Sequence, residues 1–153
     1  MSRLSQVREK VDEIILNMEK KEKISSALAH LYGVSFAATF IAEHRGLNSE
    51  LASIAGMMHD IYAYSSGSYT DHAHKGADMA RNILNELNIT SQQETDTICS
   101  MIYHHDDKEI IDGPMDEVLK DADVMHHALN DYSKEIKEKE KTRFEALKKE
   151  FDF

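Results

Sequence analysis

The chain has 153 residues with 41% hydrophobic and 30% charged residues, which fits one globular domain, and its net charge is −10. Its only cysteine, Cys99, excludes an intramolecular disulfide framework, and the negative charge disfavours stable binding to nucleic acids or anionic membranes. No stretch approaches the ~20 apolar residues that span a membrane, and the chain opens with no signal-like segment, so we expect a cytoplasmic protein.

The elements predicted from hydrophobic periodicity are all helices. The chain has only 6 glycines and 1 proline, and no segment alternates as a strand does. In chain order the predicted helices cover about residues 5–20, 26–44, 49–62, 72–87 and 91–105, then a short turn or helix after Pro114, then 119–149 with a break near Asn130. We therefore predict an all-α, single-domain bundle of six or seven helices over residues 1–153, with a charged C-terminal helix over about 131–150.

Several helix starts carry capping signals. Asn48 or Ser49 can cap the third helix, and Asp71 can cap the fourth. Ser91 and Glu94 match a capping box that opens the fifth helix. These signals place histidines of the third, fourth and fifth helices near helix ends.

Helical phase separates the nine histidines into inward and outward groups. Four of them lie on the apolar stripes of their helices and are expected to face the core: His30, His59, His72 and His105. His74 leads a polar face and is expected to be exposed, and His44 suits a helix end as a structural residue. His104 lies about 100° around the helix from His105, which favours His105 as the inward one. Four buried imidazoles each need partners, and a shared metal centre would satisfy all of them.

Two aspartates have apolar neighbours. Asp60 directly follows His59 between methionines and Ile61, where a carboxylate is costly unless it is paired or bound to a metal. Asp123 also has apolar neighbours, whereas Asp121, about 200° around the helix, fits a solvated face. The sequence therefore adds Asp60 and Asp123 to the histidines as candidate metal ligands.

The ordered set of these residues resembles the HD-domain superfamily of metal-dependent phosphohydrolases. The resemblance spans about residues 25–130 and rests on a lone His30, the doublet His59-Asp60 within Met58–Tyr62, the elements His72–Ala77 and Ile102–His105, and the motif Leu119–Asp123. It implies an HD-domain-like helical fold for this region.

The resemblance also implies a metal site. His30, His59, Asp60 and Asp123 would hold a first divalent ion, and the extra histidines His72 and His105 favour a second ion bridged by Asp60. Iron, manganese, zinc, cobalt, nickel and magnesium all remain open, as do one ion versus two and His104 in place of His105.

The implied activity is hydrolysis of a small phosphorylated or nucleotide substrate by a metal-activated water. Asp60 and Lys75 are the candidate catalytic residues, with Lys75 as a phosphate contact, while Lys108 fits a surface lysine better. His127, one turn after Asp123, is a helix-face histidine or a substrate contact. Two alternatives stay open: a dinuclear-iron oxygenase on the same scaffold and a non-catalytic ligand-binding module. The C-terminal helix is expected to pack in cis or to mediate a homodimer.

Overall fold

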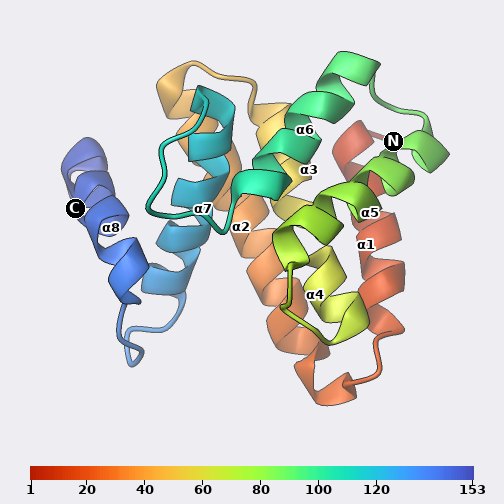
Figure 1. Cartoon of the computed structure of the whole chain (residues 1–153), viewed down its shortest axis with the longest axis horizontal. Coiled ribbons are helices and arrows are strands. Elements are labelled where there is room, and N and C mark those ends of the chain that lie inside the picture. Colours follow the sequence, from red (N-terminus) through yellow and green to blue (C-terminus); the bar gives the residue numbers. More distant parts are fainter.

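The computed structural model describes residues 1–153 and contains helices but no strand, which confirms the all-α prediction (Figure 1). The elements in chain order are α1 (Arg3–Leu16), the 3-10 turn η1 (Lys21–Lys23), α2 (Ile24–Arg45), α3 (Ser49–Met58), α4 (Ile61–Ser66), α5 (His72–Leu87), α6 (Gln92–His104), α7 (Pro114–Asn130) and α8 (Glu138–Phe151). These are eight α-helices, against the six or seven expected.

The extra helix arises where one predicted helix is divided. The helix predicted over residues 49–62 ends at Met58 and resumes at Ile61, because Asp60 leaves the helical region at φ −108° and ψ 11°. The break near Asn130 is present, since residues 131–137 separate α7 from α8. No separate short element precedes α7, which begins at Pro114 itself, a residue whose fixed φ suits the first turn of a helix.

Two of the three predicted caps form. The Asn48 side chain accepts a hydrogen bond from the Leu51 amide at 3.0 Å, and Ser91 and Glu94 complete the capping box. The prediction for Asp71 is wrong, since its side chain makes no cap hydrogen bond and its backbone lies in the left-handed region at φ 54°. Its carboxylate instead lies 2.9 Å from Nδ1 of His74.

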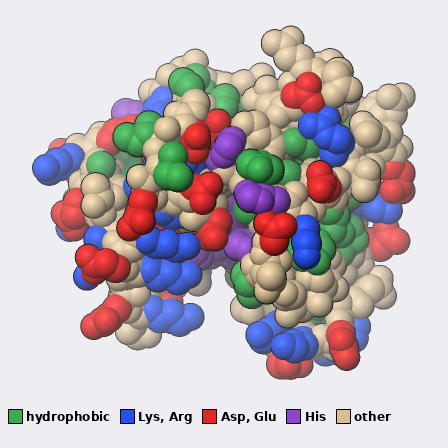
Figure 2. Space-filling view, in the orientation of Figure 1, with side chains coloured by type: hydrophobic (Ala, Val, Ile, Leu, Met, Phe, Trp, Pro, Cys, Tyr) green, Lys and Arg blue, Asp and Glu red, His purple; other side chains and the backbone are tan.

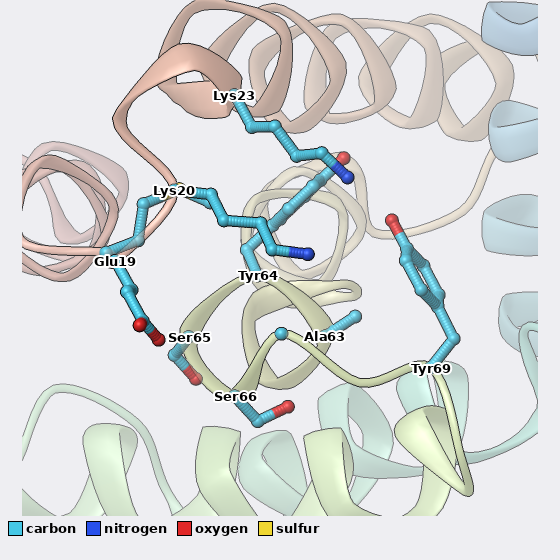
Figure 3. A pocket seen from close by; sticks show the side chains of 10 residues that line it. Glu19, Lys20, Lys23, Ala63, Tyr64, Ser65, Ser66 and Tyr69 are labelled. Carbon is cyan, nitrogen blue, oxygen red and sulfur yellow. The ribbon is translucent and has the colours of Figure 1, made fainter.

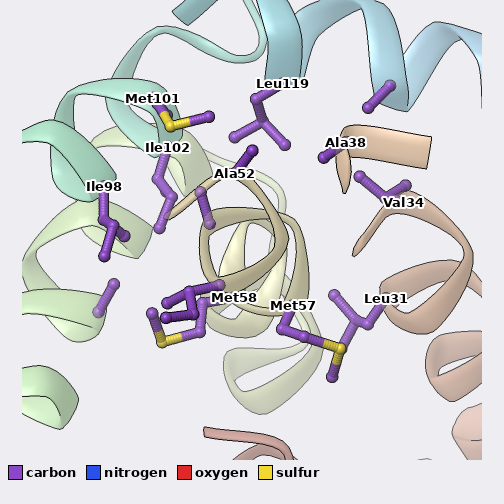
Figure 4. Close-up of a cluster of buried hydrophobic side chains, with 14 of the residues drawn as sticks. Leu31, Val34, Ala38, Ala52, Met57, Met58, Ile98, Met101, Ile102 and Leu119 are labelled. Atoms are coloured by element: carbon purple, nitrogen blue, oxygen red, sulfur yellow. The ribbon is translucent and has the colours of Figure 1, made fainter. Parts of the chain in front are cut away.

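Helices α2 and α3 form the centre of the bundle, with the other helices around them (Figure 1). Every residue of α3 from Leu51 to Met58 is buried. The core joins side chains of all eight α-helices. Figure 4 labels part of it: Leu31, Val34 and Ala38 of α2, Ala52, Met57 and Met58 of α3, Ile98, Met101 and Ile102 of α6, and Leu119 of α7. This packing fixes the positions of the helices that carry the inward histidines.

The expectation that no segment approaches a membrane-spanning length needs a correction. Residues 21–45 form one helical stretch that is long and apolar enough to cross a membrane by length and composition alone. In the structure this stretch is the core helix α2, which packs against both α3 and α7 and buries His30 and Ser35 among its apolar residues.

The C-terminal helix α8 packs in cis against α7 at the edge of the bundle (Figure 1). Its buried residues are Glu140 and Leu147, and Phe144 and Phe151 pack partly buried against the core. Arg143 also contacts Glu117 at 2.8 Å and Asp121 at 3.1 Å, and Asp121 accepts from Arg45. Asp121 is therefore buried and paired, not solvated as its position on the helix indicated.

The close approach of α2 and α3 depends on Gly56. A Cβ atom there would lie 2.7 Å from the Cα atom of Ser35, a backbone atom that cannot move aside. We expect Gly56→Ala to lower the free energy of unfolding by about 1–3 kcal/mol, the usual cost of overpacking a core. Urea unfolding monitored by circular dichroism measures this change.

Gly76→Ala is the matched control. A Cβ atom there meets its nearest neighbours at 3.4 Å or more, which is ordinary contact, and alanine favours a helix interior. This variant should be as stable as the wild type or up to about 1 kcal/mol more stable. Equal stabilities of the two variants would contradict the close-packing argument.

Candidate metal centre

Six side chains from five segments of the chain converge on one buried point. His30 comes from the middle of α2, His59 and Asp60 from the break between α3 and α4, His72 from the start of α5, His105 from the end of α6, and Asp123 from the middle of α7. All six are less than 9% exposed. Figure 2 shows histidine side chains gathered near the middle of one face of the molecule.

Four of these residues form a first group of facing donor atoms. Nε2 of His30 lies 3.0 Å from Nε2 of His59, 3.3 Å from Oδ2 of Asp60 and 3.2 Å from Oδ1 of Asp123. Nε2 of His59 lies 3.4 Å from the same Asp60 oxygen and 3.5 Å from the same Asp123 oxygen. Donors bound at about 2.0–2.2 Å to one ion lie roughly 3.0–3.5 Å apart, so these separations suit a shared cation.

A second group forms around the other oxygen of Asp60. Oδ1 of Asp60 lies 3.2 Å from Nε2 of His105 and 3.4 Å from Nε2 of His72. The two oxygens of this one carboxylate thus face two different pairs of imidazoles. Carboxylates that lie between two ions have this arrangement, so the geometry suits two adjacent cations.

Backbone carbonyl groups orient three of the imidazoles. Nδ1 of His59 donates to the Gly56 carbonyl at 2.7 Å, Nδ1 of His72 to Tyr69 at 2.9 Å, and Nδ1 of His105 to Ile102 at 2.6 Å. In each case the acceptor is three residues earlier in the chain. A proton held at Nδ1 leaves the Nε2 lone pair free for a metal, and such partners fix both tautomer and ring orientation.

The fourth imidazole, His30, is oriented by another histidine. Its Nδ1 lies 2.9 Å from Nδ1 of His126, and the pKa of His126 is lowered to about 4 by burial and by the neighbouring His30, so His126 serves as a neutral acceptor. His126 has room because residue 33 is a glycine, where a Cβ atom would lie 2.2 Å from its ring. The sequence analysis did not identify His126, because its role depends on a contact between α2 and α7.

The structure corrects the interpretation of Lys108 from the sequence. This residue is not a surface lysine but only 4% exposed, and its Nζ donates to Oδ2 of Asp123 at 2.8 Å and to the carbonyl of His105. The ammonium group therefore binds one carboxylate oxygen of Asp123, and the other oxygen faces His30 and His59. That second oxygen, Oδ1, is buried without a hydrogen-bond partner.

The charges of the cluster favour a cation. Burial on its own raises the pKa values of Asp60 and Asp123, but the imidazoles hold the pKa of Asp60, and Lys108 with the imidazoles that of Asp123, well below the usual range, so both are ionised. Burial lowers the pKa of His59, yet the two carboxylates raise it to about 10. His59 therefore carries a proton at neutral pH, and a divalent cation would take the place of that proton between the buried donor atoms. The unpartnered Asp123 oxygen and the converging Nε2 atoms fit a metal site.

A cavity of about 220 Å³ opens onto the cluster. Its lining includes Tyr64, Tyr69, Asp106, His127 and Lys137 besides the donor residues. His127 donates from Nδ1 to the buried carboxylate of Glu140 on α8 at 2.9 Å. Lys137, at the start of α8, forms no salt bridge. Sequence reasoning did not identify Lys137 or Glu140, because a charged C-terminal segment gives no sign of which side chains turn inward.

The structure does not bring every predicted residue to this cavity. Lys75 is exposed, and its Nζ lies 5.5 Å from the centre of the Tyr62 ring, away from the cluster. His104 points towards Asp112, at 3.7 Å, while its neighbour His105 joins the cluster. His74 is exposed and stacks on Tyr103. Of the two candidate catalytic residues, only Asp60 lies in the site.

Comparison with known proteins gives one match. A family model described as HD domain matches residues 27–144, which is well over half of the chain and includes all six donor residues. No curated protein and no solved structure matches the chain.

The Lys108–Asp123 pair has a measurable effect on stability. We expect Lys108→Met to lower the free energy of unfolding of the chelator-treated protein by about 3–5 kcal/mol, because a buried carboxylate loses its charged partner. Denaturant titration measures this. Lys75→Met, which changes an exposed lysine, should stay within about 0.5 kcal/mol of the wild type. A Lys108→Met protein as stable as the control would refute the pairing.

Metal affinity should rise with pH. The metal-free His59 is protonated below its pKa of about 10, and a cation must displace that proton, so acid favours the metal-free form. We expect the apparent affinity for zinc or manganese to increase up to about tenfold per pH unit for each proton displaced, between about pH 6 and pH 8. Competition with a chelator, corrected for the titration of the chelator itself, measures this. An affinity independent of pH would contradict displacement of a proton.

Proposed function

The chain belongs to the HD domain family, and from that premise we propose that it is a metal-dependent phosphohydrolase acting on a small phosphorylated substrate. Proteins of this family are mostly metal-dependent hydrolases. The observation that carries the proposal is the Asp60 carboxylate, whose oxygens lie 3.3 Å from His30 on one side and 3.2 Å from His105 on the other. This arrangement supports two adjacent divalent ions.

The six converging side chains would form two sets of metal ligands that have Asp60 in common. His30, His59, Asp60 and Asp123 would hold one divalent ion, and Asp60, His72 and His105 would hold the other. When bound, the ions would supply positive charge for phosphate oxygens and would lower the pKa of a water molecule that attacks phosphorus. This accounts for phosphate chemistry in a chain whose net charge is −10.

The residues of the chain prepare the site for this chemistry. The backbone acceptors of His59, His72 and His105 keep the Nε2 atoms aimed at the centre before any ion binds. Lys108 holds Asp123 with one oxygen facing the same centre. Because these groups are buried and fixed, little reorganisation accompanies binding.

Substrate contacts fall to the residues at the mouth of the cavity. Lys137 lines the cavity and has no acidic partner, so we propose it, in place of Lys75, as a side chain that contacts a phosphate oxygen. The cavity volume of about 220 Å³ favours a small substrate over a polymer. We also propose that the protein acts in the cytoplasm and binds no nucleic acid stably, because its strong negative charge repels polyanions.

A phosphatase assay tests the proposal directly. The purified protein is analysed for bound metal, and then assayed against phosphomonoesters and phosphodiesters with manganese, iron, cobalt, nickel, zinc or magnesium. We expect phosphate release with at least one ion, and a loss of about 10²-fold or more in kcat/KM for Asp60→Asn, because its carboxylate serves both groups of ligands. Iron-dependent oxygen consumption without phosphate release would identify an oxygenase instead.

The neighbouring histidines of α6 supply the matched control. His105→Gln should lose about half of the bound metal, whereas His104→Gln should retain all of it, because only His105 faces Asp60. Metal analysis by mass spectrometry reads out both variants. Full metal content in Asp60→Asn and His105→Gln would overturn the ligand assignment, whether or not the protein hydrolyses phosphate.

A further inference from the structure

A second hollow lies beside the metal cavity, between the α1–α2 connection and the end of α4 (Figure 3). Residues 18–20 with Lys23 form one wall, and residues 63–67 with Tyr69 form the other. Its volume is about 60 Å³, against about 220 Å³ for the metal cavity. A hollow of this size has room for one small polar group such as a phosphate.

Two tyrosines connect this hollow to the metal cavity. Tyr64 and Tyr69 line both spaces, so a ligand at the metal cluster and a group in the hollow would contact the same two rings. The Tyr69 carbonyl accepts from Nδ1 of His72, and the ring centres of Tyr69 and His72 lie 5.3 Å apart. The hollow is therefore tied to a metal-ligand residue through the backbone and not merely near it.

The hollow is locally basic in an acidic protein. Lys20 and Lys23 line it, and their ammonium groups point into the space between Tyr64 and Tyr69 (Figure 3). Neither ammonium group forms a salt bridge or a hydrogen bond, although the chain has 28 acidic residues. Glu19 is the only acidic residue in the lining, and it points to the opposite side, towards Ser65.

The tyrosine hydroxyls add hydrogen-bond donors. The ordinary pKa of a tyrosine is about 10, so the phenols of Tyr64 and Tyr69 keep their protons at neutral pH. A phosphate oxygen in the hollow would accept from these hydroxyls and from the two ammonium groups. Such charge-assisted hydrogen bonds are about twice as strong as neutral ones.

We propose that this hollow binds a second phosphate group of the substrate while the first phosphate lies at the metal cluster. The inference rests on the proposed function and makes it more specific, since the preferred substrate is then a small molecule with two phosphate groups. Lys20 and Lys23 select for the second phosphate, and Tyr64 and Tyr69 lie between the two groups.

Binding of phosphonates tests this without turnover. Methylphosphonate has one anionic group, and alkane bisphosphonates of increasing chain length have two. With the metal-loaded full-length protein, isothermal titration calorimetry should show the best bisphosphonate binding about tenfold or more tighter than methylphosphonate, because two linked groups occupy two adjacent sites. The double variant Lys20→Ala/Lys23→Ala should lose that gain and bind methylphosphonate as the wild type does.

Lys21→Ala is the control, because Nζ of Lys21 donates to the Leu16 carbonyl and lies outside the hollow. This variant should keep the full bisphosphonate gain. An unchanged gain in the double variant, or no gain in the wild type at any chain length, would overturn the inference.

The two proposals fail in distinguishable ways. If no phosphate ester is hydrolysed but the bisphosphonate gain is present and depends on Lys20 and Lys23, the hollow stands and the phosphohydrolase assignment falls. If esters are hydrolysed but the gain is absent, the inference falls alone. If no ester is hydrolysed and neither phosphonate binds, both proposals are overturned.

Discussion

The structure depends on two ionised carboxylates, Asp60 and Asp123, held inside a helical bundle. An isolated buried carboxylate would neutralise itself or destabilise the fold, so each oxygen needs a compensating group. The bundle supplies four imidazoles and one ammonium group, drawn from segments as far apart as α2 and α7. The helices are thus placed so that these charged side chains meet, and the apolar core shown in Figure 4 holds the helices in position.

Helix ends make this charge cluster geometrically simple. The last carbonyl groups of a helix have no partner within the helix. In α3 and α6 the carbonyls of Gly56 and Ile102 accept from the imidazoles of His59 and His105, three residues further along. The same bond that completes the helix end therefore orients the ligand. This explains why the inward histidines of these helices lie at their C-terminal ends.

Much of the candidate site could be predicted from the sequence, because helical phase is a local property. The phase of His30, His72 and His105 relative to apolar neighbours indicates burial, and that of His74 indicates exposure; all four are as expected. Lys108 escaped prediction because its burial depends on a carboxylate 15 residues further along the chain. Lys75 was assigned by its place in a motif, and motif position does not determine which way a long side chain points.

The attachment of α8 is in part sensitive to ionic strength. Leu147 is buried, Phe144 and Phe151 pack partly buried against the core, and Arg143 and Arg45 form ion pairs between this helix and the bundle. Lys137, directly before the first turn of α8, lines the metal cavity, and Glu140 in that turn accepts from His127, another residue of the lining. The Debye length is about 8 Å at physiological salt and shortens as salt rises, which weakens exposed pairs most. Dissolved salt would therefore weaken the Arg45–Glu150 pair, near the end of α8, more than the better buried pairs of Arg143, while the metal ligands on the inner helices keep their places.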